Sequence, residues 1–235
     1  MLVAAAQLPG VRIHRESYLR SAFAKSCAPD QVEEAVRTSP SAAGIDASLI
    51  EKAASDSIRF ETAKVSTLSA AAGLPGGIGI AAAVPADLAQ YLAHMMRIAQ
   101  KLAYLYGWPE LFEGSGDDLD DGTHNILMLF FGVMFGTQVA NAAVASVAKM
   151  IAEQAVRQLP KQALTKGAIY PLVKQVASLL GTQMTKQIFA RGVGKVIPVI
   201  GAAVEGGITL ATFPPMCKRL RVHLRGLDLG AARVA

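Results

Sequence analysis

Five polar side chains recur between residues 86 and 106 at spacings that could build a binding site. They are Asp87, Gln90, His94, Arg97 and Lys101, separated by three, four, three and four positions. This spacing places all five on one face of a helix, with apolar side chains on another face. The face could be the polar wall of a pocket, in which Asp87, Gln90, His94 and Arg97 bind the headgroup of a ligand. It could also be the solvent-facing side of an amphipathic helix, which is the interpretation we favour.

The case for an enzyme rests on the same face. Asp87 and His94 could serve as acid and base in a lipid-processing hydrolase, which we keep as the alternative function. However, the chain has four histidines and no Gly-x-Ser-x-Gly motif. Asp87 and His94 are also seven positions apart, and no second histidine follows at the spacing of metal ligands. We therefore expect a non-catalytic protein that needs neither a metal nor another cofactor.

An acidic connector follows this helix, with four aspartates and a glycine between residues 117 and 122. Calcium is the obvious ligand to consider. An EF-hand register ending at Gly122 would put Leu119 at a ligand position and Met128 where a bidentate glutamate belongs. The pattern thus fails as a calcium loop. We expect the carboxylates to cap the positive end of an apolar helix that begins near Thr123.

The run from residue 125 to 148 carries no charge over 24 positions. At about 1.5 Å per residue, a helix of this length could cross the roughly 30 Å apolar core of a bilayer. Gln138 and Asn141 interrupt the run, and its many small residues would also suit a helix buried among others in a soluble core. We favour a buried central helix of a membrane-associating bundle, with Gln138 and Asn141 as buried polar groups.

Two further charge-poor blocks accompany this run. One contains Pro75 and Pro85, and the other spans residues 196 to 216 with Glu205 as its one charge. An isolated buried carboxylate is costly, so Glu205 must be paired, protonated or exposed. Arg97 or a lysine of the basic segment is a candidate partner. Three such blocks indicate facing walls of one apolar helical core.

Charge is divided unequally along the chain. Residues 149 to 235 hold 13 basic and three acidic residues, a net +10, whereas residues 1 to 148 hold 10 and 15, a net −5. Four basic residues directly follow the last apolar block, as in a juxtamembrane flank: Lys218, Arg219, Arg221 and Arg225. We expect them to contact anionic lipid headgroups. Nucleic acid is not expected as a partner, since the basic half has few aromatic residues and no recognisable motif.

Composition sets the compartment and the fold class. Apolar residues make up 52% of the 235 and charged residues 17%. The two cysteines are unpatterned, which is typical of free thiols in a reducing compartment, so we expect a cytoplasmic protein peripheral to or embedded in the cytoplasmic membrane. No alternating strand pattern is visible. The sequence predicts an all-α protein, a single helical bundle built around the three apolar blocks.

The expected helices and breaks follow from proline, glycine and the apolar periodicity. Helices are expected after Pro29, over 46–73, over 86–106 behind Pro85, and from Thr123 onward. The basic segment should break at Pro160, at 167–171 and at 192–194. We divide the chain into an N-terminal helical extension and linker (1–44), a helical domain (45–225) and a flexible tail (226–235).

The order of these features resembles the EcsC family, named for a protein encoded beside an ABC-type exporter. A Gly-Leu-Pro-Gly-Gly turn at 73–77 precedes the helix bearing Asp87, which ends in Tyr106-Gly107. The acidic connector, the apolar helix, a lysine-rich region and Ile-Pro-Val-Ile-Gly-Ala at 197–202 follow in order. The resemblance covers roughly residues 45 to 225. It implies a helical fold and a role near the membrane, and it implies no catalytic residues.

These features together predict a function. We expect a non-catalytic helical protein that associates with the membrane or binds a lipid or another long apolar ligand. It could be accessory to a membrane transporter.

Overall fold

The computed structural model describes residues 2–72, 80–112, 119–154, 157–194 and 198–230, with the backbone alone for 68–72, 80–87, 183–194 and 198–209. These residues form helices and no strand, so the predicted all-α class is confirmed. The helices are α1 (Leu2–Ala6), α2 (Arg15–Phe23), α3 (Pro29–Arg37), α4 (Ala47–Ala72), α5 (Ile80–Leu105), α6 (Asp121–Met134), α7 (Gln138–Ala152), α8 (Lys161–Thr165), α9 (Tyr170–Gly194) and α10 (Pro198–Gly226).

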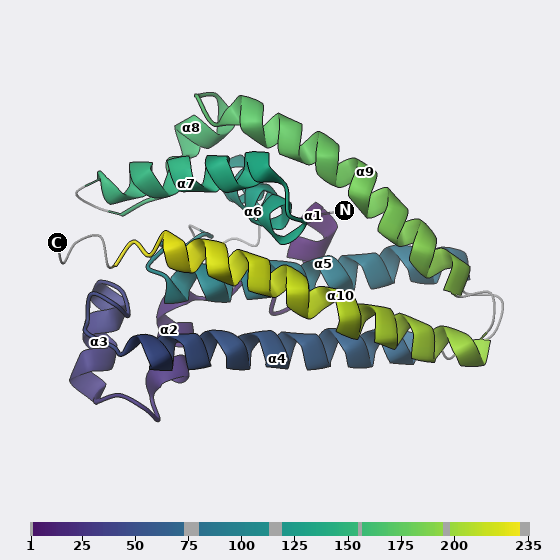
Figure 1. Ribbon diagram of the computed structural model, residues 1–235, viewed down its shortest axis with the longest axis horizontal. Coiled ribbons are helices and arrows are strands. Elements are labelled where there is room, and N and C mark those ends of the chain that lie inside the picture. The colour runs from purple at the N-terminus through teal and green to yellow at the C-terminus, as the bar shows by residue number, and fades with distance from the viewer. Residues whose placement is uncertain (1, 73–79, 113–118, 155–156, 195–197, 231–235) are drawn as a thin grey trace.

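Two long helical hairpins dominate the molecule, α4 with α5 and α9 with α10. In Figure 1, α4, α5 and α10 run along the long axis, and α9 slants from the top of the view toward the right-hand end of these helices. Helix α10 packs against α4, α5, α6 and α9, and α6 packs against α5, α7, α8, α9 and α10. The shorter helices α7 and α8 pack against α6. The last charge-poor block and the first part of the run 125–148 therefore both supply central elements.

The charge-free run from 125 to 148 is not one helix. It is divided between α6 and α7 by a turn at Gly136, whose φ of 80° lies in the left-handed region that favours glycine. The Thr137 hydroxyl donates to the Gly132 carbonyl oxygen across this turn at 3.0 Å. Within the described parts of the chain, no helix combines the length and the apolar content that crossing a bilayer requires.

The start of α6 matches the predicted role of the acidic connector. Asp120 is the N-cap residue, and its carboxylate accepts from the backbone N–H groups of Gly122 and Thr123 at 2.9 and 3.1 Å. A carboxylate at this position also stabilises the positive end of the helix dipole. Asp117 and Asp118 lie outside the described residues.

Several helix ends differ from the expectation. Helix α5 begins at Ile80, so Pro85 lies inside its first two turns rather than at its start. Helix α10 continues through Pro214 and Pro215. The break expected at Pro160 lies at the start of α8, whereas the break expected at 167–171 overlaps the first turn of α9 and that at 192–194 lies in its last turn.

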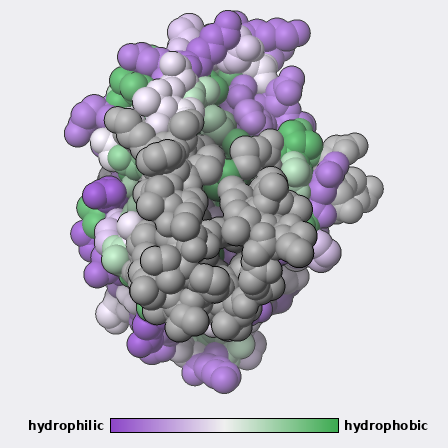
Figure 2. Space-filling view, turned by 90° about the vertical axis from the view of Figure 1, so that its right-hand side faces the viewer, coloured by the Kyte–Doolittle hydropathy of each residue, from purple (hydrophilic) through white to green (hydrophobic). Residues whose placement is uncertain are grey.

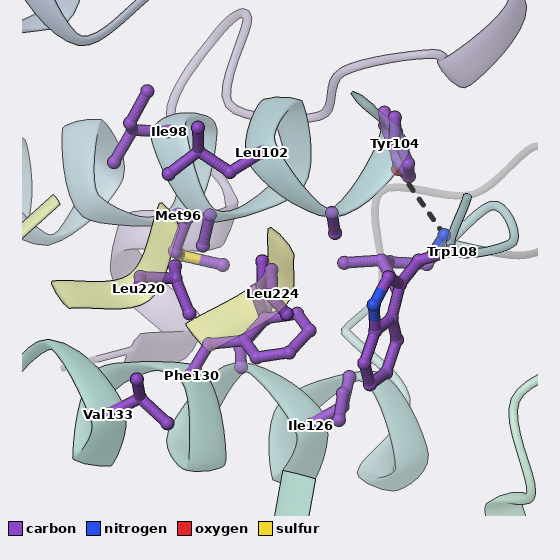
Figure 3. Packing of buried hydrophobic residues seen from close by; sticks show 14 of the residues in the cluster. Met96, Ile98, Leu102, Tyr104, Trp108, Ile126, Phe130, Val133, Leu220 and Leu224 are labelled. Atoms are coloured by element: carbon purple, nitrogen blue, oxygen red, sulfur yellow. Dashed lines mark hydrogen bonds between the residues drawn. The ribbon is translucent and has the colours of Figure 1, made fainter. Parts of the chain in front are cut away.

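The core is built by side chains from α5, α6 and α10 that point toward one another, as Figure 3 shows for Met96, Phe130 and Leu220. Trp108, at the end of α5, is fully buried and packs edge-to-face on Phe130 with ring centroids 5.0 Å apart. Burial of apolar side chains of this size contributes about 1.5–3 kcal/mol each. This shared core fixes the relative positions of the two hairpins.

The ends of the described chain pack on the same core. Leu19 and Phe23 of α2 are buried in it. Arg15 donates to the backbone carbonyl oxygens of Trp108 and Val36 at 3.1 and 2.6 Å. At the other end Leu229 is buried, and its N–H donates to the Tyr106 carbonyl oxygen at 3.1 Å. Parts of both the expected extension and the expected tail are therefore integral to the bundle.

Candidate functional site

Three of the five polar side chains on α5 converge on one buried carboxylate. Glu61 of α4 has no exposed side-chain surface. Its Oε2 lies 2.7 Å from His94 Nδ1, and its Oε1 lies 2.5 Å from Lys101 Nζ. Arg97 Nε lies 3.2 Å from both oxygens. We call these four residues the Glu61 cluster.

The helix period explains the meeting. His94, Arg97 and Lys101 lie one turn apart on α5, on the face that packs against α4. On α4, Glu61 shares one face with Ala54, Ile58 and Val65, which are buried. Spacings of four, three and four place the carboxylate at a core position of an otherwise apolar face. Sequence reasoning missed Glu61, although an acid at such a position signals a buried ion pair.

Electrostatics keep the Glu61 carboxylate ionised despite its burial. Burial alone would raise its pKa, but the hydrogen bond from His94 and the charges of Lys101 and Arg97 outweigh it and lower the pKa to about 2. Because the carboxylate is ionised, it accepts the hydrogen bond and His94 Nδ1 carries the proton. Burial also lowers the pKa of Lys101, although the charge and the hydrogen bond of Glu61 act to raise it.

The Glu61 cluster also ties the N-terminal segment to the hairpin. Arg97 donates to the Gly10 carbonyl oxygen. The Lys101 ammonium lies 4.9 Å from the ring centroid of Phe60 and 5.9 Å from that of Tyr18. Cation–π contacts of this kind help to compensate a desolvated charge. The geometry is that of a structural crosslink between α2, α4 and α5.

The five polar side chains predicted on one face of α5 do not share one environment. His94 and Lys101 are buried, so the favoured solvent-facing interpretation is wrong for them, whereas Gln90 is exposed. Arg97, one of the candidate partners considered for Glu205, pairs with Glu61. The side chains of Asp87 and Glu205 lie outside the described residues. No group of three potential metal ligands occurs among the side chains that are described.

The four basic residues of α10 divide into two pairs. Arg221 and Arg225 lie 3.8 and 3.6 Å from the carboxylate of Glu51 on α4. Lys218 and Arg219 are exposed, and no carboxylate among the described residues forms an ion pair with them. Their positive charge is thus available to a ligand.

Lys218 and Arg219 border an open groove of about 640 Å³ between α10 and the turn that joins α6 to α7. We call it the α10 groove. Its lining combines apolar and polar side chains: Val133, Gly136, Gln138, Asn141, Pro215, Lys218, Arg219, Val222 and His223. The structure places Gln138 on the exposed surface and Asn141 in a half-buried position beside this groove, so neither is a core polar group.

A second cavity of about 430 Å³ lies beside Trp108. It is lined by cations and anions together, among them Arg37, Glu16 and Glu110. The Arg15 guanidinium there already donates to backbone carbonyl oxygens. Neither this cavity nor the α10 groove is lined by the Glu61 cluster.

Comparison with protein-family models, with curated protein sequences and with solved structures finds no match for this chain.

Proposed function

We propose that this protein is a non-catalytic helical bundle that associates with the membrane, or binds a lipid or another long apolar ligand, through the end at which its two long hairpins turn. The observation that carries the proposal is the sequence of these hairpin ends. Residues 65–86, which include the end of α4 and the start of α5, contain no charged residue. Residues 196–216, which include the first part of α10, contain one, Glu205, whereas residues 186–195, which include the last turns of α9, contain three, Lys186, Arg191 and Lys195.

The architecture supports this proposal by bringing the two charge-poor segments to one end. Helices α4 and α5 pack side by side, and α10 packs along α4. The last turns of α4 and α9 and the first turns of α5 and α10 consequently gather at the right of Figure 1. Figure 2 looks onto this end, and the described residues along its upper and lower borders are mostly hydrophilic. Charge-poor segments gathered at one end, with basic residues of α9 beside them and polar surface at the border, are typical of sites that meet lipid.

The Glu61 cluster supports the non-catalytic part of the proposal. A general acid or base must lie within hydrogen-bond reach of a substrate. His94 is buried, its Nδ1 is engaged by Glu61, and the two described cavities do not include it. The cytoplasmic face of the membrane is the proposed location. A membrane transporter is the proposed protein partner, on the resemblance to the EcsC family.

Cell fractionation with lipid analysis tests the proposal. Full-length protein should pellet with membranes at low ionic strength, and any soluble portion should release lipid when it is extracted with organic solvent and examined by mass spectrometry. Protein that is entirely soluble at low ionic strength and free of lipid would overturn the proposal.

A further inference from the structure

We propose that the α10 groove binds a phosphate monoester group, either free or attached to an apolar body, through Lys218, Arg219 and His223 of α10 and the first turn of α7. This site lies away from the hairpin turns. It does not depend on the proposed function, since its ligand can be fully soluble.

The groove carries positive charge that no described carboxylate balances. Lys218 and Arg219 lie on the groove wall without an ion pair to any described carboxylate. Arg219 donates one hydrogen bond, to the Met134 carbonyl oxygen at 3.1 Å, which leaves its charge uncompensated and orients the guanidinium beside the α6–α7 turn. The lining residues include no acid. A dianionic phosphate matches two fixed cations better than a singly charged carboxylate does.

Helix α7 contributes backbone donors at the same place. Its N-cap residue, Thr137, makes no side-chain capping hydrogen bond, because the hydroxyl donates backward to the Gly132 carbonyl oxygen. The N–H groups of the first turn have no partner within the helix, and the helix dipole is positive there. Gln138 and Asn141 from this turn line the groove opposite Lys218 and Arg219. Cationic side chains and residues from a helix N-terminus thus line the same groove.

Two polar atoms of lining residues lack partners. His223 Nε2 and Asn141 Oδ1 are buried and form no hydrogen bond. Burial lowers the pKa of His223, so the ring is neutral, and its Nε2–H would donate to a phosphate oxygen. A phosphate group can therefore satisfy His223 Nε2.

The remaining lining residues are mostly apolar and can contact the part of the ligand that is attached to the phosphate. Val133, Pro215 and Val222 are apolar, and Val222 is 53% exposed. A volume of about 640 Å³ exceeds the space that a single phosphate needs. The groove therefore has room for an apolar body beside the charged group, as in a lipid with a phosphate monoester headgroup.

Titration of the ¹⁵N-labelled full chain, followed by amide NMR shifts, tests this site. The probes are inorganic phosphate and dihexanoyl phosphatidic acid below its micelle concentration, with dihexanoyl phosphatidylcholine as the zwitterionic control. The amides of residues 136–141 and 218–223 should shift and saturate with the phosphatidic acid, and they should not shift with the phosphatidylcholine.

A matched pair of variants separates a site from general charge attraction. The double variant Lys218→Ser, Arg219→Ser should weaken binding by at least about tenfold, since each removes a charge-assisted contact. The double variant Lys25→Ser, Lys166→Ser removes the same charge from exposed positions outside the groove, and it should change binding by less than about twofold.

The two phosphate probes distinguish the possible ligands. Saturable shifts with both phosphate probes identify the phosphate group itself as the ligand, and shifts with phosphatidic acid alone identify a lipid headgroup. Absence of saturable shifts with both, or equal weakening in the two double variants, would overturn it. Circular dichroism of the variants confirms that each is folded.

Discussion

The Glu61 carboxylate on α4 and the His94 imidazole on α5 share a hydrogen bond of 2.7 Å between Oε2 and Nδ1, inside the interface of the first hairpin. Two further cations from α5 approach the same carboxylate. Breaking such a cluster on one side leaves buried charges unpaired, which is more costly than a lost exposed ion pair.

Replacing Glu61 should therefore strongly destabilise the fold. The substitution Glu61→Gln leaves Arg97 and Lys101 without their counter-charge, and we expect it to lower the free energy of unfolding by about 3–5 kcal/mol. Urea unfolding followed by circular dichroism measures this change.

An exposed ion pair provides the control. Glu33→Gln removes a partner of Arg20 on the surface, and it should lower stability far less than Glu61→Gln does, because water screens the exposed pair. Adding Lys101→Met to Glu61→Gln should recover part of the loss, because it removes one unpaired charge. A cost for Glu61→Gln no larger than that for Glu33→Gln would show that the cluster does not stabilise the fold.

Acid should weaken the fold through the same carboxyl group. Glu61 has a pKa of about 2 in the folded protein, against an ordinary value of 4.5. A lowered pKa stabilises the folded state above the ordinary pKa, and this contribution, about 3 kcal/mol, is lost as the pH falls from about 4.5 toward 2. Urea unfolding at a series of pH values between 7 and 3 measures it.

The Glu61→Gln variant isolates this contribution. It lacks the titrating group, so its free energy of unfolding should fall less steeply with decreasing pH below 4.5 than that of the unaltered protein. Identical slopes would assign the acid sensitivity to other carboxylates.

The close approach of α6, α7 and α9 depends on Gly132. A Cβ atom added there would lie 2.5 Å from the Ala140 Cβ and 2.6 Å from the Val176 Cγ1. Gly132→Ala should therefore destabilise the protein by about 1–3 kcal/mol through overpacking. Thermal unfolding reports the change.

Another helical glycine gives the opposite expectation. Gly181 on α9 has open space where a Cβ would be added. Gly181→Ala should raise stability by about 0.5–1 kcal/mol, because alanine has the higher helix propensity. Equal effects of the two substitutions would contradict the packing described for Gly132.

Features of the fold that depend on local periodicity or charge can be predicted from the sequence, whereas features that depend on tertiary packing cannot. The all-α class and α4 follow from apolar periodicity, and the cap at Asp120 follows from local charge. The division of 125–148 was missed, since Gly136 stands among apolar and small residues that also suit a continuous helix. Its positive φ depends on how α6 and α7 pack, which single-sequence periodicity does not report.

The candidate sites show the same limit. Periodicity correctly grouped His94, Arg97 and Lys101 on one face, but the partner that determines whether this face is buried, Glu61, lies more than 30 positions away. The α10 groove likewise joins Lys218 and Arg219 to a turn about 80 positions earlier in the chain. Contacts over such separations depend on tertiary packing, and local patterns do not encode them.

Flotation with vesicles tests the proposed membrane association most directly. Full-length protein should float with vesicles of a neutral phospholipid, and the double variant Val84→Asp, Val199→Asp, which places charges in the two charge-poor hairpin ends, should bind them at least about tenfold less. The control Val3→Asp alters a valine on α1 that is 54% exposed, and it should float like the unaltered protein. Unaltered protein that stays with the unbound fraction, or a double variant that floats equally well, would contradict the account.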